Sequence, residues 1–141
     1  MDLFANLALG FTEAFQPINL MFCFVGVLLG TVIGILPGIG PLATISMLLP
    51  LTFGMEPSTS LIMLAGIYYG SQYGGSTTAI LVNLPGEAAS TVTTIDGYQM
   101  ALKGRAGVAL AAAGLGSFFA GCVATVLIAL VARPLTSIAL S

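Results

Sequence analysis

Charged side chains are scarce in this sequence: three basic and five acidic residues make up 6% of its 141 residues, whereas a soluble domain has about a quarter. So few charges cannot cover the surface of a soluble domain of this length. They leave uncharged intervals at residues 14–55, 57–86 and 106–132, each longer than the roughly 20 residues with which a helix crosses a bilayer. The sequence therefore predicts an integral membrane protein surrounded by a lipid bilayer.

Histidine is absent, and the two cysteines, Cys23 and Cys122, both lie within apolar runs. Metal sites bring their ligands in clusters, so we expect neither a metal site nor a disulfide. Without a nucleophile beside a base, or a metal constellation, the sequence gives no sign of an enzyme. The three basic residues form no patch, and we therefore expect no nucleic-acid partner.

Hydrophobic residues make up 57% of the sequence, and glycines interrupt them at regular intervals. Over residues 1–17 the apolar positions recur at helical spacing, which predicts an amphipathic helix lying at the membrane interface. Residues 18–73 contain the first spans, and each carries a stripe of glycines at four-residue intervals. Small residues let helix backbones approach one another in lipid, so these stripes predict closely packed helices. The stripes are Gly26, Gly30, Gly34 and Gly38, followed by Gly66, Gly70 and Gly74.

The triplet Leu-Pro-Gly occurs twice in apolar sequence, at residues 36–38 and 84–86. Proline removes a backbone donor and glycine admits conformations closed to other residues, so each triplet predicts a break in a helix. The apolar piece that follows the first break, residues 42–53, is too short to span alone and predicts a half-helix or re-entrant segment. The helix from residue 60 is expected to end at Gly74, so that residues 74–105 form a polar re-entrant or loop region.

The alanine-rich run at residues 106–132 predicts a transmembrane helix, and residues 135–141 are expected to begin another span after Pro134. Lys103 and Arg105 precede this helix and Arg133 follows it, which favours the Lys103 end as the cytoplasmic one. The whole pattern predicts an all-α, polytopic transmembrane protein with discontinuous, re-entrant helices.

Broken helices leave backbone groups unpaired, at a cost of several kcal/mol each in hydrocarbon, unless protein or water pairs with them. Transporters use such breaks as binding sites, where helix N-termini face anions and unwound carbonyls hold cations. The hydroxyls at residues 76–78, with Asn83 and Ser90 nearby, add oxygen atoms suited to carboxylate or sodium. The alternatives are that each break is a simple kink and that the hydroxyls bond back to their own helix. Glu87 and Asp96 are the acids near the breaks, and each is either a functional group or a solvated residue on an interfacial turn.

Three stretches of the sequence resemble the TctA permease family of tripartite tricarboxylate transporters. They are GTVIGILPGIGP at residues 30–41, YYGSQYGGSTTAILVNLPGE at residues 68–87 and TTIDGYQMALKGRAG at residues 93–107. The resemblance implies that residues 1–141 are the N-terminal portion of a multi-pass permease in the bacterial inner (plasma) membrane. It also implies two partners, a small membrane subunit similar to TctB and a periplasmic solute-binding protein similar to TctC. Together they would import a tricarboxylate or related carboxylate with a cation gradient.

Transferred onto this sequence, the family's motifs place the substrate and ion region at ten residues. No Lys or Arg lies within the predicted spans, so a co-bound cation would help to neutralise an anionic substrate. Ser76, Thr77 and Asn83 are candidates for binding sodium as the coupling ion, and no other cofactor is expected. The alternative function is a small pore-forming or scaffolding membrane protein without transport activity of its own, which would not need two broken helices. The ten candidates are Pro37, Gly38, Gly40, Gly75, Ser76, Thr77, Thr78, Asn83, Pro85 and Gly86.

Overall fold

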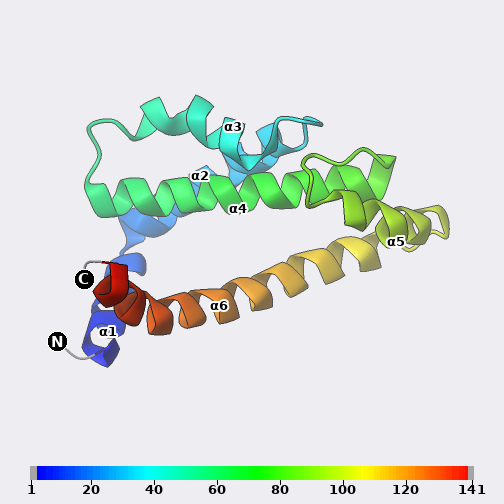
Figure 1. The fold of residues 1–141 in the computed structure, drawn as a ribbon. Helices are drawn as coiled ribbons and strands as arrows, with labels where there is room; N and C mark the ends of the chain where they lie inside the picture. The colour runs from blue at the N-terminus through cyan, green and yellow to red at the C-terminus, as the bar shows by residue number, and fades with distance from the viewer. Residues whose placement is uncertain (1–2, 140–141) are drawn as a thin grey trace.

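Helices make up most of residues 3–139, the part of the chain that this computed structural model describes, with side chains described for residues 4–132 (Figure 1). No strand occurs in that part. The all-α fold that the sequence predicts is therefore confirmed. The elements in chain order are α1 (Leu3–Ala14), α2 (Pro17–Gly34), α3 (Gly40–Leu48), the 3₁₀ helix η1 (Leu49–Thr52), α4 (Pro57–Val82), α5 (Thr91–Leu102) and α6 (Ala106–Ala139).

Helix α4 is the centre of the structure. Its 26 residues extend over about 39 Å at the usual helical rise, and α2, α3, α5 and α6 all pack against it. It also supplies most of the buried apolar side chains of the described residues, namely Met63, Ile67, Ala79 and Ile80. Two other helices, α2 and residues 106–132 of α6, are long and apolar enough to cross a membrane.

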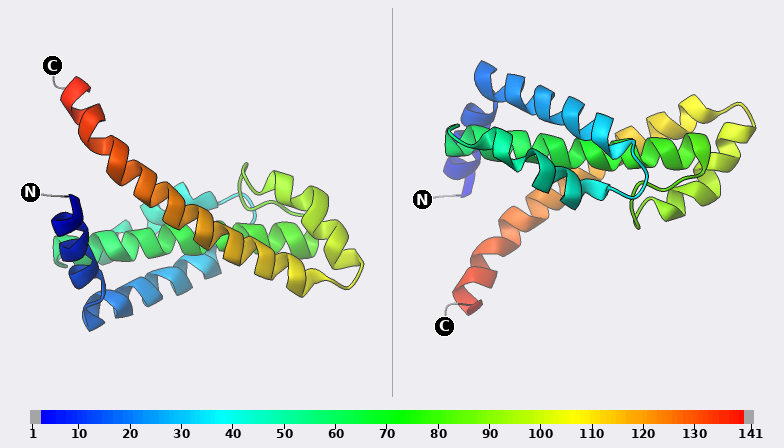
Figure 2. Two further views of the ribbon diagram at one scale, coloured as in Figure 1. Left: turned by 90° about the horizontal axis from the view of Figure 1, so that it is seen from below. Right: turned by 90° about the horizontal axis from the view of Figure 1, so that it is seen from above.

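The α2 and α4 helices run parallel and pack backbone against backbone, because each presents its glycine stripe to the other (Figures 1 and 2). A methyl group on Gly30 would overlap the carbonyl oxygen of Ile67, and one on Gly70 would overlap that of Val27. The two stripes therefore interlock, as close packing along small residues requires. The other glycines that meet the partner backbone in this way are Gly26 and Gly34 of α2 and Gly66 and Gly74 of α4.

Helix α2 ends at Gly34, and the chain then turns back as the short helices α3 and η1, which pack against α4 (Figure 1). Gly38 and Gly40 have φ angles of 84° and 66°, a region of backbone conformation that favours glycine. The return segment is short because Pro50 lacks a backbone donor and the chain tightens there into a 3₁₀ turn. It leads through Gly54, whose φ is also 84°, to the start of α4.

One predicted boundary is wrong: α4 does not end at Gly74 but continues to Val82, so residues 74–82 are helical and not a loop. Gly74 and Gly75 keep helical geometry because their missing side chains leave room for Thr31 and Gly86 to approach. The Thr77 hydroxyl donates a hydrogen bond to the Tyr73 carbonyl at 2.8 Å, so this polar side chain is hydrogen-bonded within its own helix. A short segment at residues 83–90 and the helix α5 occupy the rest of the predicted polar region.

A second predicted boundary is also wrong: α6 continues past Arg133 and Pro134 to Ala139, so no new span begins at residue 135. A proline removes one backbone donor, and transmembrane helices tolerate such a loss. The last two residues of the predicted span, 140–141, lie outside the described residues. At the other end of the chain, α1 forms a helix within residues 1–17, and its position at the membrane interface stays a prediction.

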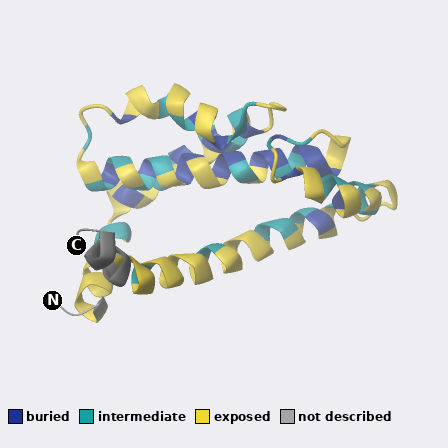
Figure 3. Ribbon diagram, in the orientation of Figure 1, coloured by how far each residue is buried: buried dark blue, intermediate teal, exposed yellow. Residues whose placement is uncertain are grey.

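Helix α6 crosses back along α4 and is exposed over most of its length (Figures 2 and 3). Its contacts with α4 are made by aromatic rings lying over glycines. A methyl group on Gly114 would lie 3.3 Å from the Tyr73 ring, and one on Gly121 would lie 3.3 Å from the Tyr69 hydroxyl. The start of α1 and the end of α6 lie at one end of the α2–α4 pair, whereas α5 and both Leu-Pro-Gly segments lie toward the other (Figure 1).

Candidate substrate site

The two Leu-Pro-Gly breaks meet in space although they are far apart in the sequence. The Gly38 amide donates a hydrogen bond to the Gly86 carbonyl at 3.2 Å. Gly86 is buried, and a methyl group on it would overlap the Cα of Gly75 and lie 3.2 Å from the carbonyl oxygen of Gly34. The second break is therefore held against the ends of α2 and α4 by contacts that only glycine permits, and the hydrogen bond from Gly38 joins the first break to it.

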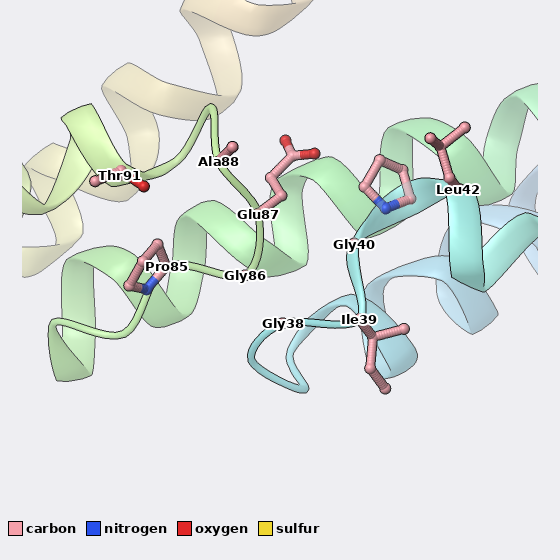
Figure 4. A pocket seen from close by; sticks show the side chains of 10 residues that line it. Gly38, Ile39, Gly40, Leu42, Pro85, Gly86, Glu87, Ala88 and Thr91 are labelled. Atoms are coloured by element: carbon pink, nitrogen blue, oxygen red, sulfur yellow. The ribbon is translucent and has the colours of Figure 1, made fainter.

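A cavity of about 480 Å³ opens between the two breaks (Figure 4). One wall is the start of α3, and the other is the segment that leads from α4 to α5. Four of the ten candidate residues, Gly38, Gly40, Pro85 and Gly86, line this cavity. The full lining consists of Gly38, Ile39, Gly40, Pro41, Leu42, Pro85, Gly86, Glu87, Ala88 and Thr91.

Two helices begin at the cavity, and no side chain caps either of them. At α3, which begins after its N-cap Ile39, the first-turn amides of Gly40 and Leu42 have no partner within the helix, and this end carries the positive part of the helix dipole. At α5, the Thr91 amide already donates to the Ala88 carbonyl at 3.3 Å. The α3 end is therefore the more open of the two toward an anionic group.

Glu87 is the one ionisable residue among those that line the cavity. Figure 4 shows its carboxylate extending from the segment that carries Gly86 and Ala88. Its backbone amide donates to the Ser90 hydroxyl at 3.2 Å, and that hydroxyl donates to the Glu87 carbonyl at 2.9 Å, which fixes the turn into α5. Burial raises the pKa of the Glu87 carboxyl above its usual value, because desolvation disfavours the charged form.

The remaining candidates lie near the cavity without lining it. Gly75 is buried beneath Gly86, and Pro37 is exposed in the first break. The Thr77 and Thr78 hydroxyls donate to carbonyls of their own helix, as one of the alternatives supposed.

Ser76 and Asn83 lie on α4 and at its end. Ser76 is half-buried, and Asn83 is exposed with a φ of 60°, where its backbone amide caps α4 by donating to the Thr78 carbonyl. A role of any of these residues in binding substrate or sodium stays a prediction.

A buried polar contact beside the cavity escaped sequence reasoning. The Thr44 and Ser71 hydroxyls lie 3.1 Å apart between α3 and α4, and Thr44 also donates to the Gly40 carbonyl at 2.8 Å. Both residues are at most 2% exposed. The sequence contains a signal for this contact: Thr44 follows Gly40 by one helical turn, and Ser71 directly follows Gly70 of the glycine stripe. Of the two acids that the sequence places near the breaks, Glu87 lines the cavity and Asp96 does not.

Helices that break around a shared cavity, together with long apolar helices, define this chain as an α-helical membrane protein with discontinuous helices. The chain belongs to the tripartite tricarboxylate transporter TctA family, whose sequence pattern matches residues 20–141. The resemblance seen in the three sequence stretches is thus confirmed, and the family is one of transporters.

One relative is an "uncharacterized 52.8 kDa protein in TAR-I ttuC' 3'region" of Agrobacterium vitis. It is 72% identical to this chain over 140 residues, which are 99% of the chain and 28% of the relative. The chain therefore spans little more than a quarter of the length of this relative. No solved structure matches the chain.

Proposed function

We propose that the chain is part of the membrane permease subunit of a cation-coupled tripartite transporter that takes up tricarboxylates or related carboxylates. The transporter lies in a bacterial inner membrane and includes a TctB-like membrane subunit and a periplasmic TctC-like binding protein. Membership of the TctA family supports this assignment. The observation that carries it is the single cavity formed by both helix breaks.

The α3 end of the cavity suits a carboxylate group. The first-turn amides of Gly40 and Leu42 and the positive end of the helix dipole lie at one wall, where an anion is favoured by up to about 1 kcal/mol at an exposed helix end. The described lining residues include no Lys or Arg, so recognition there rests on backbone amides. Substrate carboxylates would enter between Gly40 and Gly86, where the absence of side chains leaves the backbone accessible.

The hydroxyls of α4 are proposed as the second part of the site. Thr77 uses its hydrogen in the bond to Tyr73, which leaves oxygen lone pairs free to accept or to hold a cation. Ser76 and Asn83 lie within the same turn and the next, and with Thr77 they would supply oxygens to sodium. Sodium as the coupling ion stays a prediction that uptake measurements decide.

Uptake of radiolabelled citrate tests this function in cells that express the chain in its native genetic context with the proposed partners. Uptake should depend on the binding protein and on an imposed cation gradient. Thr77→Val and Asn83→Leu, expressed at normal levels, should each lower uptake about tenfold or more, as the loss of about 1.4 kcal/mol of binding predicts.

Thr125→Val is the matched control for Thr77→Val. Thr125 makes the same bond to a carbonyl of its own helix, at 2.8 Å, on an exposed part of α6 away from the cavity. It should leave uptake unchanged. Wild-type uptake by both cavity variants would refute their assignment to the site, and absence of uptake of any carboxylate by the unaltered protein would refute the function.

A further inference from the structure

The charge of the cavity conflicts with the charge of the proposed substrate. Glu87 is the sole ionisable residue among the described residues that line the cavity, and no basic residue accompanies it. Desolvation by burial raises the pKa of its carboxyl. An anionic substrate entering this space would meet a second negative charge on a half-buried side chain, where repulsion is stronger than in bulk water.

No second titratable group from the surrounding elements lines the cavity in the described part of the chain. Helix α3 contains no titratable residue, and the titratable residues of the other packed helices do not line the cavity. Those residues are Cys23 of α2, Tyr68, Tyr69 and Tyr73 of α4, and Asp96 and Tyr98 of α5. Neutralisation of Glu87 itself would remove the repulsion between its carboxylate and an anion in the cavity.

We propose that the Glu87 carboxylate takes up a proton when the carboxylate substrate enters the cavity and gives up that proton when the substrate leaves. This inference rests on the proposed function. The proton forms an O–H bond with a carboxylate oxygen of Glu87 on the side from which substrate comes, and that bond breaks on the side to which substrate is delivered. One substrate and one proton thus move together.

A proton fits this position better than sodium. A metal ion needs several oxygens at once, and Glu87 brings the one carboxylate among the described residues that line the cavity. The nearby Ser90 hydroxyl is already engaged with the Glu87 backbone on both its donor and its acceptor side. A proton needs only the carboxyl, whose raised pKa favours the neutral form.

The test compares wild type with Glu87→Gln in uptake and in substrate exchange, over pH values above the pKa range of the substrate's own carboxyl groups. For wild type, the apparent affinity should fall as pH rises, approaching about tenfold per pH unit once Glu87 is mostly ionised. Glu87→Gln imitates the neutral carboxyl, so its affinity should not vary with pH. It should still exchange internal for external substrate but should not accumulate substrate against a gradient.

Glu87→Asp and Asp96→Asn are the companion variants. Glu87→Asp keeps a carboxyl and should keep pH dependence, which separates protonation from a structural role. Asp96 is exposed on α5 and does not line the cavity, so Asp96→Asn should behave as wild type. A Glu87→Gln variant with the wild-type pH profile, or accumulation driven by sodium alone at constant pH, would overturn the proton assignment while leaving the proposed function standing. Absence of wild-type uptake would overturn both.

Discussion

At the scale of single residues, this structure depends on the absence of side chains. Gly30 and Gly70 bring two helix backbones into contact, and Gly86 brings the second break into contact with Gly75 of α4. The four-residue glycine spacing is visible in the sequence and predicts a packed face. It does not say which glycines meet. The contact of Gly86 with Gly75 could not be predicted, because it depends on how the segment after α4 folds back over the helix.

Gly30→Ala tests the backbone contact directly. The new methyl group would overlap the Ile67 carbonyl, and the helices must separate to admit it. We expect a loss of about 1–3 kcal/mol in stability, as overpacking of a close contact usually costs. Thermal or denaturant unfolding of the purified protein in detergent measures it.

Gly116→Ala is the control for Gly30→Ala. Gly116 lies within α6, and a methyl group there would have no neighbour within 4 Å. Because alanine favours a helix over glycine, this variant should be as stable as wild type or slightly more stable. If the two alanines change stability equally, the overlap with Ile67 is not what destabilises Gly30→Ala.

At the scale of elements, α3 is held by little apolar burial, and the buried hydroxyl pair Thr44 and Ser71 joins it to α4. The sequence predicts the short segment from its length and the flanking prolines and glycines. It misplaces the end of α4, because Gly74 and Gly75 indicate a break when read locally. The neighbouring helix stabilises them as part of a continuous helix, and such tertiary support is not readable from local sequence.

Thr44→Val and Ser71→Ala test the link between α3 and α4. Each change leaves the other hydroxyl without its buried partner, so each should lower stability by roughly 1 kcal/mol. In the double variant neither hydroxyl remains, and the total loss should be smaller than the sum of the single losses. Unfolding measurements on all four proteins give this coupling, and strictly additive losses would show that the two hydroxyls do not support each other.

At the scale of the whole molecule, α2 and α4 run in one direction along its length, and α3 and α6 run back in the other (Figure 1). The start of α4 lies at one end, and α5 lies at the other (Figure 1). The composition predicts that the chain crosses a membrane, and it predicts the breaks. That both breaks lie toward the same end follows only from the parallel course of α2 and α4, which the sequence does not reveal.

Single cysteines at Glu56 and Asp96, both exposed, test this arrangement after Cys23 and Cys122 are replaced by serine. A membrane-impermeant maleimide should label the two positions from opposite sides of the membrane. Lys103 and Arg105 follow α5, so the Asp96 position should be the cytoplasmic one. Labelling of both positions from the same side would contradict the direction assigned to α4.

The interlocked glycines have a mechanical consequence. Because α2 and α4 touch through their backbones, the contact orders no side-chain rotamers at its centre, and association there carries little of the usual entropic cost of immobilising side chains. Few side chains can rearrange to let one helix slide past the other. The two helices should therefore move as one rigid unit during any transport cycle. Changes in backbone conformation should be confined to the segments that bend at Gly38, Gly40 and Gly54.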